Sequence, residues 1–416
     1  MKREFVVRKS SLIIFIFGLW GLWYVFFNAS IVLRPMYQYL WPLAVILSVL
    51  LNIYSIYKNY SNLYIAYFLL VVACLLSLII SRDLSSSLDY IKRLVLAMLF
   101  AVAITSRNGT ENIIFKIMEC FCVVMLAISF SQYLLPNLYT GVVLPLCSQH
   151  DSWLVTSAIR SGEAVGFTNG TSQNGLFMAI GFVLFASKAA CWKKNRFLSV
   201  LLSALFFGMA FATGKRSYSL ICLVLLILIV HFASNNKKIA NRVIVGTVVL
   251  IVCYFVFIFA ARSIPALNNT IEKTIRLSNR GDVTNGRLIM YSDAWNEFKT
   301  HFLTGIGVDA AEKVLGGATH NSYLQWLVEF GFPLVLIPFV AVLYVPALKI
   351  KKILGLLKER KNDEKYQVLC PLMMTVMILF SGIVAVPFQW TNVFMIYMIM
   401  QLFLYKQLRK GRTYGQ

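Results

Sequence analysis

Long unbroken runs of apolar side chains constrain the fold of this chain more than any other feature. An α-helix needs about 20 such residues to cross a hydrocarbon core of about 30 Å. Segments that approach or reach this length lie at residues 10–27, 37–57, 63–80, 88–105, 113–135, 174–190, 197–213, 217–233, 243–261, 332–348, 367–385 and 388–405. Membrane β-barrels alternate apolar and polar residues instead. The sequence therefore predicts an all-α polytopic membrane protein with about 12 transmembrane helices.

Composition and cysteine usage agree with this fold class. Hydrophobic residues make up 59% of the chain and charged residues 13%, whereas a soluble domain carries about 25% charged residues. This contrast excludes soluble globular, disordered and fibrous proteins. The 8 Cys fall mostly in or beside apolar spans, with no CxxC motif and no Cys/His cluster. We therefore expect them to be packing residues, and the sequence predicts no metal site.

The positions of Lys and Arg predict the orientation. Placing the N-terminus in the cytoplasm assigns 25 of the 39 Lys and Arg to the inside and 11 of the 17 acidic residues to the outside. Because cytoplasmic loops are enriched in Lys and Arg, we expect both termini inside. The formal net charge of +22 is then a topology signal and a contact for anionic lipids, not a sign of nucleic-acid binding.

Two of the predicted outer loops are long. Residues 136–173 are rich in Gly, Ser, Thr and Asn, and residues 262–331 form the longer and more patterned loop. Long loops in compact proteins are commonly functional or disordered. We expect three parts: helices 1–9 with the first loop (1–261), an outer loop with amphipathic helices (262–331), and helices 10–12 with a cytoplasmic tail (332–416).

An amphipathic helix is predicted directly after the Asn285-Gly286 turn. Apolar side chains recur at spacings of three and four residues, the pattern of one helix face, at Leu288, Tyr291, Trp295, Phe298 and Phe302. Such a helix fits the outer membrane interface. Arg287 stands in its first turn, where the helix dipole disfavours a cation. This conflict suggests that Arg287 is there to bind an anion.

A second short helix is predicted just before the tenth span. Ser322 and Gln325 have the spacing of a capping box, and Gly331 is a natural stop, so about nine residues should be helical. His320 then precedes a helix N-terminus, which attracts phosphate and keeps an imidazole neutral and able to accept a proton. The alternative is that His320 merely caps the helix.

Two adjacent cations, Lys215 and Arg216, lie in the very short outer connection between the seventh and eighth spans. This position runs against the orientation rule. Either the side chains reach the lipid head groups, or they form a phosphate clamp in which Arg216 offers a planar pair of donors and Lys215 a point charge.

These motifs resemble the O-antigen ligase and polymerase superfamily. The resemblance rests on HNSYLQWLVEFG at 320–331, GRLIMYSDAWNEFKTHFLTGIGVD at 286–309 and TGKRS at 213–217. It implies a glycosyltransferase of the GT-C-like class in the bacterial inner membrane, with its active site in a large periplasmic loop. It also implies undecaprenyl pyrophosphate as the carrier of the donor glycan, and lipid A–core as the acceptor in the ligases. The chain departs from the usual pattern at Phe332-Pro333, where an aliphatic residue and Gly are more common.

The resemblance also implies roles for single residues. His320 matches the histidine proposed to activate the acceptor hydroxyl, and Arg216 and Arg287 match arginines proposed to hold the pyrophosphate. The chemistry agrees on independent grounds: the leaving group needs its charge neutralised and the hydroxyl needs a base. Since no Asp-x-Asp occurs and the 4 His are scattered, the sequence favours Arg216, Arg287, Lys215 and Arg280 over a metal, with no cofactor. A single base predicts inversion at the anomeric carbon.

Further substrate contacts are expected around these residues, at Asn321, Tyr323, Gln325, Glu329 and, from the first loop, Arg160 with Glu163. Glu329 is alternatively a structural ion-pair partner or a residue that orients His320 or an arginine, and Tyr323 an interfacial anchor.

The leading hypothesis is an O-antigen ligase acting between a lipid-linked glycan and lipid A–core. The alternatives are an O-antigen polymerase and, in another class, a lipid-linked glycan transporter. A transporter would place ionisable residues at mid-membrane, whereas here they collect at the outer face.

Overall fold

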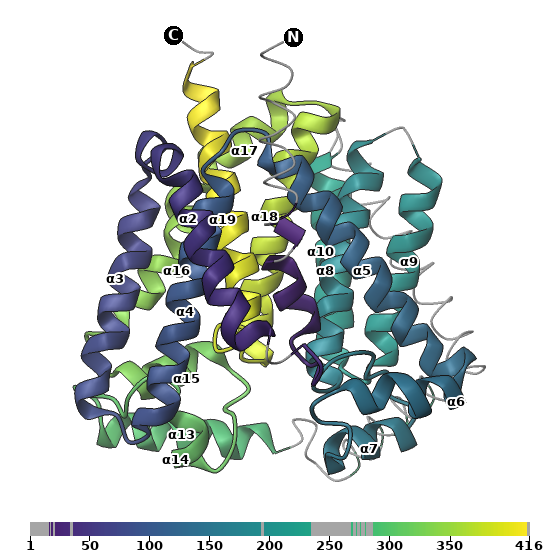
Figure 1. Ribbon diagram of the computed structural model, residues 1–416, viewed down its shortest axis with the longest axis vertical. Helices are drawn as coiled ribbons and strands as arrows, with labels where there is room; N and C mark the ends of the chain where they lie inside the picture. The colour runs from purple at the N-terminus through teal and green to yellow at the C-terminus, as the bar shows by residue number, and fades with distance from the viewer. Residues whose placement is uncertain are drawn as a thin grey trace. The chain divides into compact units, whose positions relative to one another are not determined.

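The computed structural model describes residues 21–33, 36–192, 195–233 and 286–413, with the single residues 16, 18, 19, 268, 272, 275 and 279. Over these residues the chain is helical, and its β-structure is one isolated bridge between Ser30 and Cys147 (Figure 1). The all-α prediction is therefore confirmed for the described part of the chain.

The chain forms two compact units, each assembled from three segments. Unit 1 comprises residues 1–44, 109–279 and 354–377, and unit 2 comprises residues 45–108, 280–353 and 378–416. The predicted boundary at 261/262 lies outside the described residues, so the predicted division into three parts stays a prediction.

Unit 1 is built around α8, Thr171–Cys191, which is buried along almost its whole length. Its glycines allow neighbouring helices to approach closely: a Cβ at Gly181 would overlap the Phe206 ring of α9. The other elements are α5 Thr110–Leu134, α6 Pro136–Leu138, η3 Tyr139–Val143, η4 Leu144–Leu146, α7 Trp153–Arg160, α9 Arg196–Ala212, α10 Arg216–Ala233 and, before them, η1 Met36–Leu40.

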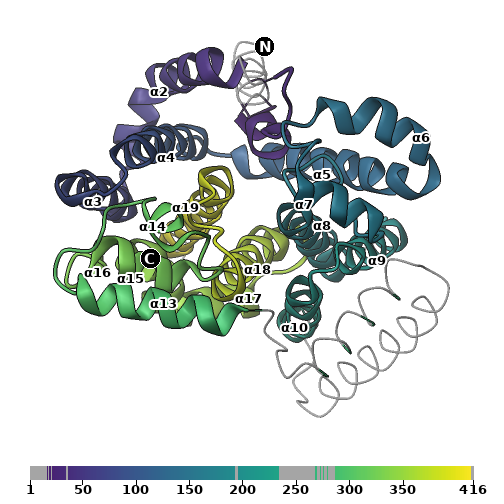
Figure 2. The same ribbon diagram turned by 90° about the horizontal axis from the view of Figure 1, so that it is seen from below.

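Unit 2 contains the α3–α4 pair, the helices that follow residue 286, and the last helix. Its elements are α3 Asn62–Ser77, η2 Leu78–Ile80, α4 Leu84–Thr105, α13 Arg287–Thr300, α14 Ala311–Leu315, α15 Ser322–Phe330, α16 Leu336–Leu348 and α19 Thr391–Thr413. Three helices run from one unit into the other: α2 Trp41–Lys58, α17 Ile350–Glu359 and α18 Asn362–Val384. Seen along the bundle, α13 lies beside α15 (Figure 2).

Unit 2 has two ends of different character. At one end, which we call the His320 end, the α3–α4 connection meets the loop before α14, where Arg82 N donates to Ile306 O at 3.0 Å. At the other, the Lys406 end, Arg409 Nη1 donates to Tyr60 O at 2.9 Å and Lys406 Nζ to Thr105 O at 3.2 Å. The two ends lie at opposite ends of α4 and α19 (Figure 1).

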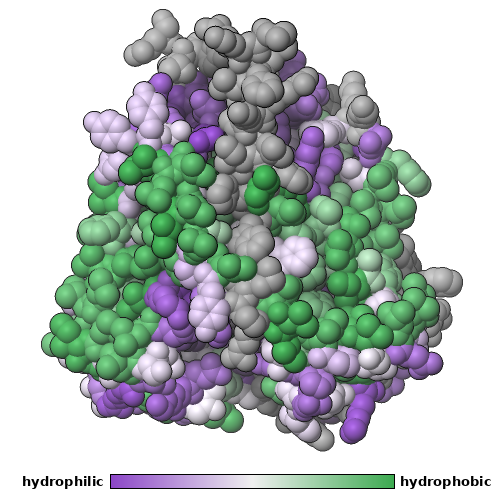
Figure 3. Space-filling view, viewed as in Figure 1, coloured by the Kyte–Doolittle hydropathy of each residue, from purple (hydrophilic) through white to green (hydrophobic). Residues whose placement is uncertain are grey.

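Six helices among the described residues are long and apolar enough to cross a membrane, and they cover the predicted spans at 37–57, 63–80, 113–135, 174–190, 217–233 and 367–385. The predicted spans at 88–105, 197–213, 332–348 and 388–405 are also helical, but those helices are shorter or more polar. The span at 10–27 is described only in part and the span at 243–261 not at all. Apolar side chains cover the outward face of α3 in unit 2, and polar ones gather beyond its His320 end (Figure 3). The chain is a multi-pass membrane protein.

Candidate active site

His320 lies directly before α15, whose cap differs by one residue from the predicted one. The helix begins at Ser322 and ends at Phe330 before Gly331, as predicted, but the N-cap is Asn321, whose side chain accepts from the backbone N–H groups of Tyr323 and Leu324. The Ser322 hydroxyl instead donates to Gln389 Oε1 at 2.8 Å. The predicted capping box is therefore wrong, because a contact far along the chain takes the hydroxyl that it needs.

The N-terminal amides of α15 are already used. Besides the two amides capped by Asn321, the Ser322 N–H donates to Ala385 O at 3.1 Å and the Gln325 N–H to Asn321 O at 3.0 Å. A phosphate at this helix N-terminus would find none of these donors available, so the expectation that free N–H groups hold it is wrong. These four amides of α15 therefore offer no free donor to an anion.

The backbone of His320 adopts the left-handed conformation, with φ at 53°, and its side chain is half-buried. This conformation is uncommon for residues other than glycine, and it persists only where the surroundings impose it. Thr319 next to it is buried, and its hydroxyl lies within hydrogen-bond distance of Asn321 O, at 3.0 Å, and of Gln325 Oε1, at 3.1 Å. The turn around His320 is therefore held from inside the protein.

Arg287 is the first residue of α13, as predicted, and is half-buried. Gly286 before it has φ at 80° and supplies no capping side chain. One turn later, Met290 Cε lies 3.4 Å from where a Cβ of Gly317 would be. The start of α13 thus packs against the loop that leads into His320, so both residues belong to the same end of unit 2.

The predicted apolar stripe of α13 is only partly confirmed. Phe298 and Ala294 are buried in a small core with Ile306, Ala311 and Val328, but Leu288, Trp295 and Phe302 are exposed. The helix therefore buries Ala294 and Phe298 against the protein and leaves larger aromatic and aliphatic side chains on the surface, as an interfacial helix does.

The loop after α13 fits against the end of α15 by backbone contacts. The N–H groups of Ile306 and Gly307 donate to Val328 O and Glu329 O at 3.1 and 3.0 Å. A Cβ at Gly305, where φ is 71°, would overlap the backbone of Glu329 and Phe330. Glycine is required here because only a residue without a side chain permits both the close approach and the positive φ.

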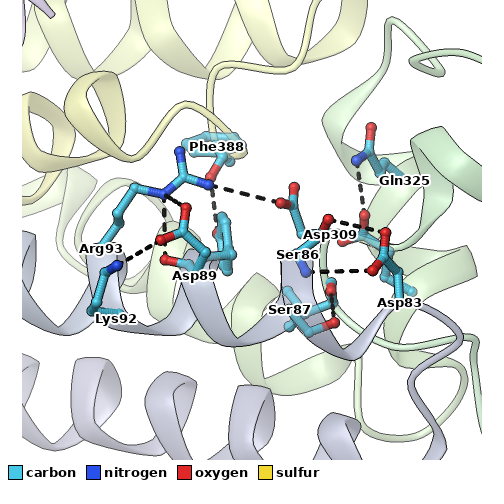
Figure 4. Close-up of polar contacts among 12 residues, drawn as sticks. Asp83, Ser86, Ser87, Asp89, Lys92, Arg93, Asp309, Gln325 and Phe388 are labelled. Atoms are coloured by element: carbon cyan, nitrogen blue, oxygen red, sulfur yellow. Dashed lines mark hydrogen bonds and ion pairs between the residues drawn. The ribbon is translucent and has the colours of Figure 1, made fainter. Parts of the chain in front are cut away.

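A cluster of charged residues lies beside this contact (Figure 4). Glu329 is fully buried and accepts from Gln325 Nε2 at 2.8 Å, and burial, together with the charge of Asp309, raises its pKa to about 8. Burial also raises the pKa of Asp309 to about 6, although Arg93, whose Nη2 lies 3.9 Å from the carboxylate, opposes the rise. Two carboxyl groups therefore share one poorly solvated region, and the structural ion pair expected for Glu329 is not among the contacts of the described residues.

The residues of α15 that were expected to contact substrate all bind other groups of the protein. Asn321 caps the helix, and Tyr323 donates its hydroxyl to Leu379 O at 2.8 Å. Gln325 and Glu329 are 3% and 0% exposed. To bind sugar directly, Gln325 and Glu329 would have to leave the interior. Their burial is not indicated by the sequence alone.

Arg216 and Lys215 lie in unit 1, where Arg216 begins α10 after the left-handed Gly214. A Cβ at Gly214 would lie 2.7 Å from the carboxyl carbon of Glu163, and Ala164 N donates to Ala212 O at 2.8 Å. The first outer loop is therefore folded onto the Lys-Arg turn. The two contacting segments lie about 50 residues apart in the sequence, and no local motif predicts their contact.

The structure thus groups the predicted site residues into two sets. Unit 2 holds His320, Arg287 and the α15 residues, and unit 1 holds Arg216 and Lys215, with Arg160 exposed at the end of α7. Arg280 lies outside the described residues. Among the residues that are described, no three His, Cys, Asp or Glu side chains are grouped so as to hold a metal ion. That the arginines of both units gather around one diphosphate stays a prediction.

Comparison with known proteins gives a family match over about a third of the chain. A family model described as O-antigen ligase matches residues 197–339. The matched segment contains the Lys215-Arg216 turn, α13 and α15, and it confirms the resemblance found in the sequence motifs. No curated protein matches the chain significantly.

Proposed function

Given that residues 197–339 belong to the O-antigen ligase family, we propose that the chain transfers an O-antigen glycan from undecaprenyl pyrophosphate to a sugar hydroxyl of lipid A–core. The transfer takes place at the periplasmic face of the bacterial inner membrane and completes lipopolysaccharide. Both termini then lie in the cytoplasm, with the Lys406 end of unit 2 inside and the His320 end outside.

One observation carries this proposal: His320 is held half-buried in a left-handed turn at the N-terminus of α15, on the same end of unit 2 as Arg287. A general base must be fixed within reach of the proton that it removes. The positive potential of a helix N-terminus disfavours the imidazolium form. The position therefore suits a neutral imidazole that accepts a proton.

In the proposed reaction, His320 takes the proton of the acceptor hydroxyl as its oxygen attacks the anomeric carbon of the donor. The bond from that carbon to the pyrophosphate oxygen breaks, and undecaprenyl pyrophosphate leaves with the electron pair. Because one nucleophile displaces the leaving group in a single step, the configuration at the anomeric carbon inverts.

The leaving pyrophosphate needs positive charge that is fixed before the reaction. With the N-terminal amides of α15 engaged in the protein, the proposal assigns this task to Arg287, to Arg216 and Lys215 of unit 1, and to Arg280. Arginine suits it because its guanidinium group offers paired donors to phosphate oxygens and stays charged. Arg160, on the exposed end of α7, is proposed as a contact to the acceptor.

The test is transfer in a reconstituted membrane that contains lipid-linked O-polysaccharide and purified lipid A–core. His320→Ala should lower the rate of transfer by about 10²–10⁴-fold, the usual contribution of a general base. His150→Ala is the matched control, since His150 pairs with Asp151 on the surface of unit 1 and should keep full activity. Unchanged transfer by His320→Ala would remove the histidine from its role.

The product decides between the ligase and the polymerase. Glycan attached to lipid A–core supports the proposal, whereas elongation of the lipid-linked chain would show a polymerase. Arg287→Lys and Arg216→Lys add a second test, because a lysine keeps the charge but loses the paired donors. Both variants should lose most of the transfer activity if the guanidinium groups bind phosphate.

A further inference from the structure

A buried chain of hydrogen bonds leads from the middle of α15 to the turn that carries His320. Glu329 Oε1 is 2.8 Å from Gln325 Nε2, and Gln325 Oε1 is 3.1 Å from Thr319 Oγ1. The Thr319 hydroxyl is 3.0 Å from Asn321 O and accepts from Asn321 N at 3.4 Å. It therefore bridges the residues on both sides of His320. Thr319, Gln325 and Glu329 are each no more than 3% exposed, so water does not compete for these bonds.

The protonation of Glu329 can change the direction of the hydrogen bonds in this network. An ionised carboxylate only accepts, so it turns the NH₂ group of Gln325 toward itself and leaves the amide oxygen to accept from Thr319. A neutral carboxyl can donate to the amide oxygen instead. The amide then presents NH₂ to Thr319, and the threonine hydroxyl is free to donate to Asn321 O. The two arrangements use the same heavy-atom positions, because an amide oxygen and nitrogen exchange places by rotation about one bond.

We infer that Glu329 is a positioning residue for His320, which in its neutral form orients Gln325 and Thr319 so that they hold the left-handed turn. This inference rests on the proposed role of His320 as the base. The titratable groups around Glu329 are Asp309 before α14, Cys74 of α3 and Tyr90 of α4. Arg93 faces Asp309, and among the residues described none forms an ion pair with Glu329. An ionised Glu329 would thus gain no ion pair of its own.

The experiment compares Glu329→Gln with wild type over pH 6 to 9 in the reconstituted transfer assay. A glutamine has nearly the same shape as the neutral acid and cannot ionise, so it keeps the arrangement that holds the turn. Because the pKa of Glu329 is raised to about 8, wild-type kcat should fall above that pH, and the kcat of Glu329→Gln should not. Glu312→Gln, which alters an exposed acid on α14, is the control and should keep the wild-type profile.

Two further variants interrupt the hydrogen-bond network without changing a charge. Gln325→Leu and Thr319→Val should lower kcat by about 10-fold or more, since small displacements of a catalytic group have effects of this size, while KM for the donor stays the same. Size-exclusion profiles and thermal unfolding separate this loss from misfolding. If Glu329→Gln is as inactive as His320→Ala, or if Gln325→Leu keeps the wild-type kcat, the positioning role is wrong. If His320→Ala itself is active, it is the proposed function that fails.

A second site lies at the Lys406 end of unit 2. A cavity of about 260 Å³ is lined by Asn59, Ser61, Tyr64, Thr105, Asn108, Leu402, Tyr405, Lys406, Arg409 and Lys410. Three of these side chains are cationic, none is acidic, and the remainder are mostly hydroxyl and amide groups. Such a lining provides the donors that a phosphate group requires.

The charge of unit 2 is divided between its ends. Its described acidic residues, including Asp83, Asp309 and Glu329, belong to the α3–α4 connection, to α4's first turns or to the α13–α15 region. No described acid of this unit lies at the Lys406 end. Lys406 and Arg409 are held in place by the carbonyl groups of Thr105 and Tyr60, at 3.2 and 2.9 Å, so their charges are fixed before a ligand arrives.

We propose that this cavity binds a phosphate-bearing anion, and specifically the head group of an anionic lipid. Basic pockets at the cytoplasmic ends of transmembrane helices bind such head groups, and each Lys or Arg near an anionic surface contributes about 1 kcal/mol of attraction. A free phosphate ion offers the same chemistry, so the experiment has to tell the two sources apart.

The test measures lipid retained by the purified full chain, by native mass spectrometry, after exchange into nanodiscs of phosphatidylglycerol or of phosphatidylcholine. The double variant Arg409→Gln, Lys410→Gln should retain several-fold less phosphatidylglycerol than wild type. Lys351→Gln, Lys352→Gln on the exposed start of α17 is the matched control and should retain the wild-type amount. Equal loss in both double variants, or none in either, would reject the site. Stabilisation of wild type by inorganic phosphate alone, without lipid retention, would reject the lipid and leave a free anion as ligand.

Discussion

The two ends of unit 2 share helices α3, α4 and α19 but differ in how tightly they are packed. At the His320 end the backbone of the 305–307 loop lies directly on the end of α15, and Gln325 and Glu329 are sealed inside. At the Lys406 end a cavity remains open, and cationic side chains bind carbonyl groups at the ends of helices. Dense packing fixes a geometry, whereas an open cationic surface can receive a ligand, and this contrast separates the end proposed to be catalytic from the end proposed to bind lipid.

The largest expected effect is that of Gly305→Ala. A Cβ there meets the backbone of Glu329 and Phe330 at a positive φ, so the loop has to move, and we expect a loss of at least ~2 kcal/mol of stability together with loss of transfer. The measurement is thermal unfolding and transfer rate. Gly316→Ala is the control, because that residue also has a positive φ but no atom within 4 Å of the added Cβ. Similar losses in both variants would contradict the claim that the His320 end depends on close backbone contact.

At the other end, Lys406→Met should lower stability by about 1–2 kcal/mol, because it removes charge-assisted hydrogen bonds to the carbonyl groups of Thr105 and Arg107. Transfer activity of the protein that remains folded should be unchanged. Thermal unfolding and transfer rate at a temperature below the transition check both statements. A large fall in the transfer rate would mean that the two ends are not functionally separate.

An effect of the opposite sign is expected for Asp309→Asn, and it depends on pH. The pKa of Asp309 is raised to about 6, so the folded state binds this proton more tightly than the unfolded state does. In wild type this group therefore lowers stability as pH rises from about 4 to 6. The asparagine variant should be more stable than wild type by up to about 3 kcal/mol at pH 7 and nearly equal at pH 4. A variant that is less stable at pH 7 would show that the contact with Arg93 outweighs the burial.

The smallest effect should come from Arg82→Gln. Arg82 Nη1 lies 3.1 Å from Glu297 Oε1, but its side chain is 47% exposed, and exposed pairs contribute about 0–1 kcal/mol. We expect a decrease in stability of a few tenths of a kcal/mol that disappears in high salt. Unfolding curves at two salt concentrations measure it, and a loss that persists in high salt would show a contribution from something other than charge.

The sequence predicted well those features that depend on neighbouring residues. The start of α13 at Arg287 and both limits of α15 follow from local turns and stops. The same reasoning assigned the N-cap to Ser322 and missed Asn321, since both types cap helices equally well. What decided between them was Gln389, 67 residues away, which binds the Ser322 hydroxyl.

The parts that could not be predicted all involve distant segments. Glu163 lies against Gly214, and Asp309 lies beside Glu329, and neither pair has a fixed spacing that marks it in a sequence. The burial of Gln325 and Glu329 was also missed, because a polar residue on a short helix before a membrane span is ordinarily expected to face water or substrate. The network with Thr319 keeps both inside.

The contacts from Ser322 to Ala385 and Gln389 tie the first turn of α15 to the bend that joins the last two helices. The tilt of membrane helices responds to the thickness of the bilayer. We therefore expect thin and thick membranes to set His320 at different heights above the lipid, so that the acyl-chain length of the host membrane would tune the transfer proposed above.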